Sequence, residues 1–349
     1  MKILSRLFSL AGIGLLAGNV LAQNDSPYKV LATTQLMGSG GIDYVTADSA
    51  ARRVYVPRGG NTFVFDLDSH QYVGTITNVG GHGVAVDPAT HHGFASGSPV
   101  GMFDTATLQK LKDVAVDSRP DGILFEPFTG KVLILSHASP SLTLIDPKDG
   151  TVAGTIDVGG AMEQAQSDGQ GKLYVDVEDE NKIAVVDLKT QKVLTKYALG
   201  EKGDGPAGLG LDVKNHLLFA MCHSQNCIVL NADDGKILAT LPIGNGTDGG
   251  GFNPNTLEAF SSQRDGTLTI IKESSPTSFA VAQTVPTKAG CKTCSLDTKN
   301  NQIILICTER LAGAATPAPV TNAPAGGQRR GGGGGRGGPG NLDVLWVGH

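Results

Sequence analysis

The stretch GKLYVDVEDENKIAVVDLKTQKVLTKYALG, residues 171–200, decides the fold. It contains three runs rich in Val, Ile, Leu and Tyr, which are KLYVDV, KIAVVDL and KVLTKYA. Short turns with Asp, Glu, Asn and Lys separate the runs. Apolar and β-branched runs of this length, bounded by turn residues, predict β-strands. The stretch therefore predicts consecutive strands joined by tight turns, and the periodicity of a long helix is absent from it.

The same unit recurs along the chain, for example in HGVAVDPATHHGFAS (82–96), DGILFEPFTGKVLIL (121–135), AGLGLDVKNHLLFAM (207–221) and TCSLDTKNNQIILI (293–306). The equivalent first-strand positions are Tyr44, Val84, Ile123, Gln164, Leu209, Gly250 and Cys294, at spacings of 40, 39, 41, 45, 41 and 44 residues. Four strands in such a period form one propeller blade. The sequence therefore predicts an all-β chain, a seven-bladed β-propeller of four-stranded blades.

The last blade lacks a fourth strand at the C-terminus. The N-terminal stretch YKVLATTQLM (28–37) resembles the fourth strand KILATLPIGN (236–245). We therefore expect the ring to close by the N-terminal strand completing the last blade, which removes two open sheet edges. Residues 341–349 fit the third strand of this blade. Residues 311–340, rich in Pro and Ala and then in Gly and Arg, are expected to be a disordered loop inserted before it, on the face that carries the candidate site.

The N-terminus has the features of a signal peptide over residues 1–22. Lys2 and Arg6 precede the uncharged apolar run 7–17, and small residues lead to a cleavage site after Ala22. The apolar run is too short to span a bilayer, so we expect no transmembrane segment. We therefore expect a periplasmic or secreted protein with a single propeller domain over 23–349. Removal of 1–22 lowers the Lys+Arg count from 28 to 26 against 33 acids, so the formal charge moves from −5 to −7. This acidity argues against nucleic-acid binding, despite the Arg-Gly segment.

The repeats resemble the YVTN-type β-propeller family, and the chain from residue 28 to 349 is similar to exported YncE-like proteins. The resemblance rests on RVYVPRGGNTFVFDL (53–67), RPDGILFEPFTGKV (119–132), residues 171–193 of the opening stretch and LATLPIGNGTDGGGFNP (238–254). It implies the propeller fold. Most members of the family have no assigned reaction, so the resemblance implies no chemistry.

In such a propeller, two sets of loops meet on one face, which we call the top face. The loops from fourth to first strands place there Ile42 and Asp43, His82, Asp121, Met162 and Glu163, Ala207, Asp248, and Lys292. The loops from second to third strands add Arg58, His137, Glu178, His223, Arg264 and Glu309. Convergent acids, imidazoles and bases predict a site for a divalent metal or a polar small molecule at the channel mouth. The alternative interpretation is a water-filled mouth lined by solvated charges.

The five cysteines predict disulfides in an exported protein. The short loop in MCHSQNC brings Cys222 near Cys227. In CKTCSLDTKNNQIILIC, the turn at 298–301 favours Cys294–Cys307, with Cys291–Cys307 as the competing pair. The favoured pairing leaves the thiol of Cys291 free.

No nucleophile or phosphate-binding motif is present, which disfavours an enzyme. We interpret the protein as a binding scaffold for an unknown small molecule or protein, as a monomer with no cofactor required by the sequence. The alternative is an enzyme with its site at the channel mouth. Such an enzyme would be a metal-dependent lyase or lactonase, or an oxidoreductase with a quinone- or haem-type cofactor.

Ending the chain at Gly326 is expected to destabilise the whole propeller, because it removes the third strand of the last blade. Excision of residues 326–340 is expected to leave the melting temperature unchanged, because that segment is predicted to lie outside the core. Thermal unfolding of the two deletion variants checks both statements. An unchanged melting temperature after truncation would contradict the strand assignment.

Overall fold

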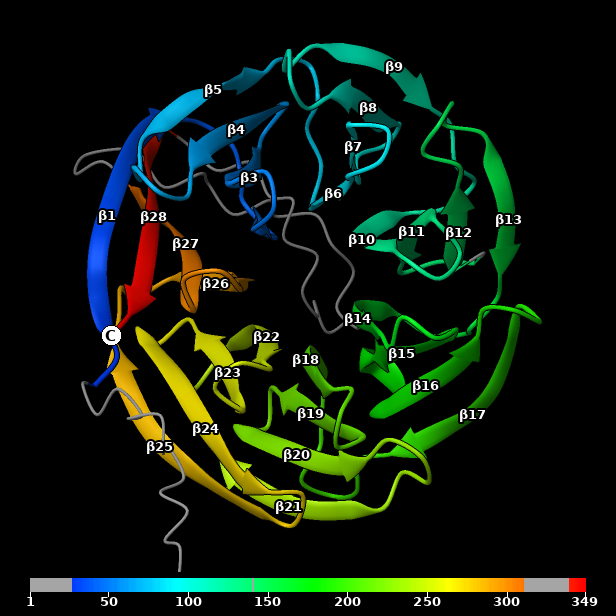
Figure 1. Cartoon of the computed structure of the whole chain (residues 1–349), viewed down its shortest axis with the longest axis vertical. Coiled ribbons are helices and arrows are strands. Elements are labelled where there is room, and N and C mark those ends of the chain that lie inside the picture. The colour runs from blue at the N-terminus through cyan, green and yellow to red at the C-terminus, as the bar shows by residue number, and fades with distance from the viewer. Residues whose placement is uncertain (1–26, 140, 311–338) are drawn as a thin grey trace, which may run out of the picture.

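The computed structural model describes residues 27–139, 141–310 and 339–349. These residues form seven four-stranded antiparallel sheets arranged in a ring (Figure 1). The predicted fold class is therefore confirmed. The predicted signal peptide and most of the predicted inserted loop lie outside the described residues. Among the residues that are described, no helix is long and apolar enough to cross a membrane.

In six blades the strands run from the centre of the ring outward in chain order, and in the last blade the outer strand is the N-terminal one. The first strands are β2 (Thr46–Asp48), β6 (Val84–Asp87), β10 (Pro120–Glu126), β14 (Met162–Ser167), β18 (Pro206–Asp212), β22 (Thr247–Asn253) and β26 (Cys291–Asp297). The second strands are β3 (Arg53–Arg58), β7 (His92–Ala95), β11 (Lys131–Ser136), β15 (Lys172–Val177), β19 (Leu217–Cys222), β23 (Glu258–Gln263) and β27 (Gln302–Arg310). Six predicted first-strand positions lie in first strands, whereas Tyr44 precedes β2.

The third and fourth strands complete the blades. The third strands are β4 (Asn61–Asp66), β8 (Val100–Asp104), β12 (Leu142–Ile145), β16 (Lys182–Asp187), β20 (Asn226–Asn231), β24 (Thr267–Ser275) and β28 (Gly340–Gly348). The outer strands are β5 (Tyr72–Ile76), β9 (Lys110–Val114), β13 (Val152–Ile156), β17 (Lys192–Ala198), β21 (Ile237–Pro242), β25 (Ser278–Pro286) and, in the last blade, β1 (Lys29–Gly38). A short 3-10 helix, η1 (Glu178–Glu180), joins β15 to β16.

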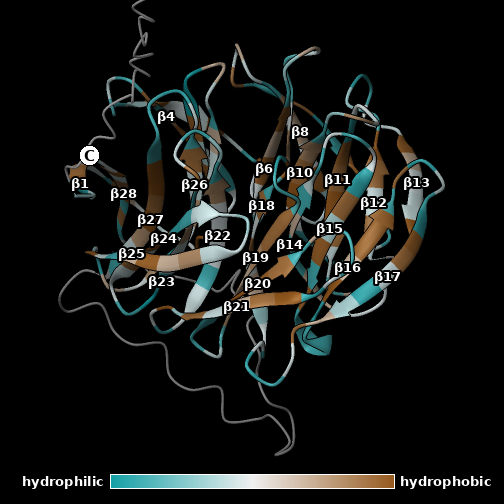
Figure 2. Ribbon diagram, turned by 60° about the horizontal axis from the view of Figure 1, so that its bottom comes forward, coloured by the Kyte–Doolittle hydropathy of each residue, from teal (hydrophilic) through white to brown (hydrophobic). Residues whose placement is uncertain are grey.

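The middle strands read as continuous apolar runs because neighbouring blades pack on both of their faces. In β11, every residue after Lys131 is buried, whereas the outer strand β17 is mostly exposed or half-buried. Figure 2 shows the apolar residues concentrated on the strands and the hydrophilic ones in the loops at both ends. The core therefore consists of layers between blades, and it leaves the loops free to carry polar groups.

The ring closes through pairing of β1 with β28, as predicted. The register runs from Lys29 opposite Gly348 to Gly38 opposite Gly340. Gly340 is the first residue of β28, so the predicted insertion ends slightly too late. Blade 7 therefore contains both ends of the described chain.

Arg58 supports this closure and does not line the channel mouth. Its residue surface is 2% exposed, and its guanidinium donates hydrogen bonds to the carbonyls of Leu36, Gly38, Gly40 and Gly340 at 3.0–3.4 Å. The sequence placed Arg58 in the top-face site. Its side chain instead joins blade 1 to the two strands that close the ring.

The two favoured disulfides are wrong, and the competing pair Cys291–Cys307 is the one formed. The turn after Asp297 sets Cys294 opposite Leu305. A register shift between Cys291 and Cys294 then brings Cys291 opposite Cys307. A bulge of this kind has no clear signature in the sequence.

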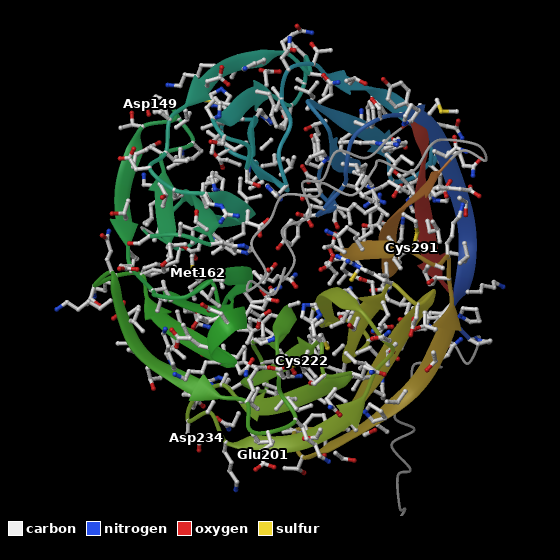
Figure 3. All side chains as sticks on the ribbon, turned by 180° about the vertical axis from the view of Figure 1, so that it is seen from behind. Asp149, Met162, Glu201, Cys222, Asp234 and Cys291 are labelled. Atoms are coloured by element: carbon white, nitrogen blue, oxygen red, sulfur yellow. A yellow bond between two sulfur atoms is a disulfide. The ribbon has the colours of Figure 1, made fainter. Side chains whose placement is uncertain are left out.

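Cys222 and Cys227 are both free and buried. Cys222 lies opposite Asn226, and Met221 lies opposite Cys227. The two thiols are thus one register position apart, and they pack into different apolar clusters on opposite faces of the sheet. Figure 3 marks Cys222 in blade 5, well away from Cys291 in blade 7.

Replacement of Arg58 by Met is expected to lower the free energy of unfolding by about 2–4 kcal/mol, because buried carbonyls lose their donor. The matched control is Arg53→Met on the same strand, where a half-exposed pair with Asp66 is lost. The control is expected to cost about 0–1 kcal/mol. Urea denaturation of both variants measures the difference. Equal losses would show that Arg58 does not support the closure.

Candidate functional site

The top-face loops bring most of the predicted site residues together at the channel mouth. One series of ion pairs begins with Lys292, whose Nζ lies 2.5 Å from Oδ1 of Asp43. Oδ2 of Asp43 lies 2.6 Å from Nδ1 of His82, and the same nitrogen lies 3.0 Å from Oδ1 of Asp121. Blades 7, 1, 2 and 3 thus contribute alternating basic and acidic groups from their first strands and the loops before them.

The series continues into blade 4 through His137. Its Nε2 lies 2.8 Å from Oδ2 of Asp121 and 3.1 Å from Oε1 of Glu163. The hydroxyl of Tyr44 donates to the other oxygen of Glu163, Oε2, at 3.1 Å. Asp121 therefore contacts one imidazole with each of its two oxygens, and Glu163 lies at the end of the series.

The remaining predicted residues form shorter contacts on the other side of the mouth. Asp248 accepts from Arg264 at 2.9 Å and lies 3.1 Å from Nζ of Lys292. Oε1 of Glu178 lies 3.4 Å from Nε2 of His223. Of the charged residues predicted for the top face, all except Arg58 and Glu309 are therefore joined to at least one other, and Glu309 pairs instead with Lys288 at 2.8 Å.

Close packing of the inner strands allows this convergence. A Cβ atom on Gly122 would lie 2.5 Å from the carbonyl oxygen of Glu163, so only glycine lets β10 approach β14 this closely. Asp121, the residue before Gly122, then reaches the same imidazole as Glu163, that of His137. The hydroxyl of Thr293 donates to the carbonyl of Asp43 and accepts from the amide of Val45, which fixes the loop before β2 against β26.

The neighbouring carboxylates and imidazoles shift one another's pKa values. Asp121 and then Asp43 raise the pKa of His82 to about 10, and Asp121 and then Glu163 raise the pKa of His137 to about 10. Burial alone would raise the pKa of Asp121, but the two imidazoles outweigh it and lower the value to about 2. Burial raises the pKa of Glu163 to about 7. Without a metal, both imidazoles are therefore protonated at neutral pH.

The carboxylates of Asp43, Asp121 and Glu163 line an upper cavity of about 360 Å³ on the top face. Six of the seven blades contribute to it. The lining residues are Asp43, Asp121, Glu163, Glu178, His223, Gly246, Thr247, Asp248, Arg264 and Lys292. A polar cavity of this size, with charges from many loops, fits a small charged molecule.

Side chains cross the channel below the upper cavity. Tyr44 of blade 1 reaches Glu163 of blade 4. The amide of Gln164 accepts from the backbone of Leu209 at 2.9 Å and donates to the carbonyl of Gly250 at 3.0 Å. A lower cavity of about 610 Å³ lies beyond these side chains, towards the loops that join the first and second strands, and its lining is more apolar. Tyr44 and Gln164 therefore separate two cavities.

Sequence reasoning missed the roles of Tyr44 and Asp176. The repeat pattern aligns Tyr44 with Val84 and Ile123, and the phenol at a position that is otherwise aliphatic is the signal in the sequence. Asp176 interrupts the apolar run of β15, is fully buried, and accepts no hydrogen bond from a described residue. Burial raises the pKa of Asp176 far above the usual range, which favours the neutral acid.

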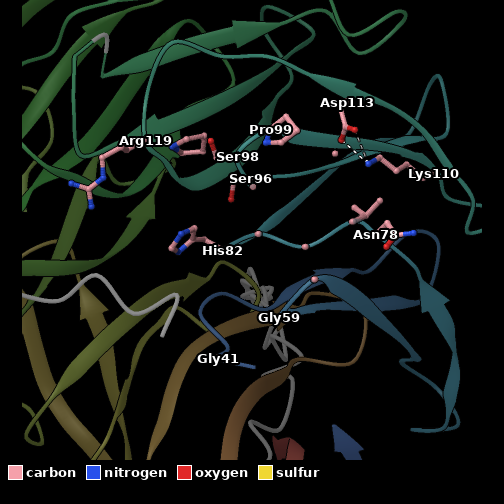
Figure 4. A pocket seen from close by; sticks show the side chains of 17 residues that line it. Gly41, Gly59, Asn78, His82, Ser96, Ser98, Pro99, Lys110, Asp113 and Arg119 are labelled. Atoms are coloured by element: carbon pink, nitrogen blue, oxygen red, sulfur yellow. Dashed lines mark hydrogen bonds and ion pairs between the residues drawn. The ribbon is translucent and has the colours of Figure 1, made fainter. Parts of the chain in front are cut away.

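A side groove of about 560 Å³ opens beside the mouth, above blade 2 (Figure 4). His82 lies at its inner end, and the ion pair of Lys110 with Asp113 lies at its outer end. Glycines form much of its wall, and a Cβ atom on Gly80 would lie 2.3 Å from the carbonyl oxygen of Gly59. The groove therefore leads from solvent to one imidazole of the site.

Among the described residues, two groups of side chains could hold a metal ion. They are Asp43, His82 and Asp121, and Asp121, His137 and Glu163, and the donor atoms in each group lie within 4.8 Å of one another. Imidazole nitrogen and carboxylate oxygen are usual ligands of zinc and related ions. The geometry therefore permits two states of these side chains, one in which the imidazoles carry protons and one in which the side chains bind metal ions.

Comparison with models of known protein families gives no match, and no curated protein matches in sequence. Solved structures support the seven-bladed propeller fold. A chain from the crystal structure of the mitotic checkpoint complex aligns with a TM-score of 0.70 at 13% identity, over 86% of this chain and 95% of that chain. The structure of U3-55K aligns with a TM-score of 0.70 at 9% identity, over 91% and 99%. At such identities the likeness shows the fold alone.

In chelator-treated protein, stability is expected to fall as the pH rises from about 6.5 towards 10. The folded pKa values of His82 and His137 are about 10, above the unfolded value of 6.5. Their stabilisation is thus complete below pH 6.5 and is lost as the pH passes through the folded value. His137→Gln should show a shallower fall. Chemical denaturation over this pH range tests this, and identical slopes for the two proteins would contradict it.

Proposed function

We propose that the protein is an exported, YVTN-type propeller that binds a small polar molecule in the upper cavity. The observation that carries this proposal is the cavity itself, which is lined by paired charges from six blades and has the Tyr44–Glu163 contact beneath it. Residues 1–22 resemble a signal peptide. The Cys291–Cys307 disulfide is consistent with an oxidising compartment. No chemical step is required for this function.

The distribution of charge suggests a zwitterion as the ligand. Glu178 is 7% exposed and offers a carboxylate to a cationic group deep in the cavity. Arg264 and His223 have side chains that are 52% and 41% exposed, so they can meet an anionic group at the rim. A small amino acid or betaine carries both charges within the length of such a cavity. Charges on an open surface are screened by salt and would not select a zwitterion over other charged molecules.

A metal-dependent enzyme, such as a lyase or lactonase, is the second candidate. It is favoured by the two groups of imidazole and carboxylate ligands at the cavity floor. A bound divalent ion would polarise a carbonyl or activate water there. Turnover of a lactone that is abolished by a chelator and restored by zinc would establish this candidate in place of simple binding.

Isothermal titration with a panel of amino acids, betaines and dicarboxylates tests the proposed binding function. At least one zwitterion is expected to bind, and Glu178→Gln should weaken its binding about 10-fold or more, because a charge-assisted contact is lost. The matched control is Glu201→Gln, an exposed carboxylate in the loop between β17 and β18 (Figure 3). Equal binding by both variants would place the ligand elsewhere.

A further inference from the structure

The carboxylate of Asp121 lies between two imidazoles with one oxygen on each. Oδ1 lies 3.0 Å from Nδ1 of His82, and Oδ2 lies 2.8 Å from Nε2 of His137. Asp121 is 7% exposed, so little water reaches it. A single buried carboxylate thus joins two otherwise separate groups of ligands.

The imidazole protons are too few or poorly aligned to give each of these contacts a hydrogen bond. Nδ1 of His82 carries at most one proton, and its aligned partner is Asp43 at 2.6 Å. Oδ1 of Asp121 consequently accepts no hydrogen bond from any described residue. Nε2 of His137 faces both Asp121 and Glu163, yet it forms an aligned hydrogen bond with neither of them nor with another described residue. Buried polar atoms of this kind are costly unless another group satisfies them.

We propose that the floor of the upper cavity holds two divalent transition-metal ions, with Asp121 as their bridging ligand. One ion is held by Asp43, His82 and Asp121, and the other by Asp121, His137 and Glu163. This inference rests on the proposed function, because it identifies the floor of the same cavity. Glu178 and Arg264 lie outside both groups and remain available to an organic ligand.

The ligand chemistry selects the class of metal. Each ion receives one imidazole nitrogen and carboxylate oxygens from two residues, which suits zinc, manganese, iron or cobalt better than magnesium or calcium. Donor atoms now lie 2.6–3.1 Å apart. Bonds of about 2.0–2.2 Å require a separation of roughly 3.3 Å, so the side-chain ends need to part by a few tenths of an ångström.

The outer carboxylate of each group has its own supporting donor. Nζ of Lys292 contacts Oδ1 of Asp43, which leaves Oδ2 directed at His82. The hydroxyl of Tyr44 donates to Oε2 of Glu163, which leaves Oε1 directed at His137. Metal-binding carboxylates are oriented by such outer hydrogen bonds. On either side of Asp121, each group thus consists of one imidazole and one carboxylate that is oriented by an outer donor.

Metal loading of the purified, chelator-stripped full chain tests the proposal. Zinc alone or manganese alone is added, excess ion is removed, and bound metal is counted by mass spectrometry. About two ions per chain are expected, the number in a bridged two-metal site. Asp43→Asn and Glu163→Gln should each retain about one ion. Asp121→Asn should lose both, whereas the exposed control Glu201→Gln should keep both.

Electron paramagnetic resonance provides a readout that does not depend on any variant folding. The wild-type manganese form should show the coupled spectrum of a bridged pair. The proposal would be overturned by spectra of isolated manganese ions, or by one or no bound ion in the wild type. It would also be overturned if Asp121→Asn and Glu163→Gln retained equal amounts of metal. Glu178-dependent ligand binding by the stripped protein, combined with no metal uptake, would reject the metal site alone. Loss of both kinds of binding would reject the proposed function as well.

Discussion

Pairing of β1 with β28 is the constraint on which the rest of the structure depends. The blades bury their faces against each other, so each needs a neighbour on both sides, and an open ring would expose two such faces. One sheet that contains both ends of the described chain removes this weakness. Arg58 strengthens it by binding carbonyls on both closing strands and in the loop that follows β1. The position of every top-face loop follows from this closed ring.

The closed ring also explains how so many charges share a small volume. The groups lie in the inner strands or in short loops beside them, so the hydrogen-bonded sheets hold the acidic and basic groups in an alternating order. The order from Lys292 through Asp43, His82, Asp121 and His137 to Glu163 crosses five blades. Preorganised groups of this kind bind a charged ligand without the entropic cost of ordering flexible loops.

The period of the repeats was sufficient to predict the blades, the closing strand and the face on which the site residues gather. The period of the repeats does not predict the direction of individual side chains or the register between neighbouring strands. Arg58 occupies the same loop position as His137, yet its guanidinium reaches back to the carbonyls of the closing strands. A single register shift in β26 decides which cysteine reaches Cys307. The position of Asp176 within an apolar strand is enough to predict a buried carboxyl group. Which residues surround that group is known only from the structure, because they come from other parts of the chain.

The contact between Tyr44 and Glu163 spans the centre of this propeller and lies between its upper and lower cavities. The upper cavity lies on the top face, and the lower cavity lies towards the loops of the opposite face. The residence time of anything bound above is then governed by the top-face loops and the side groove. The apolar lower cavity can evolve a separate specificity without disturbing the charged site, because the two share little more than the residues that divide them.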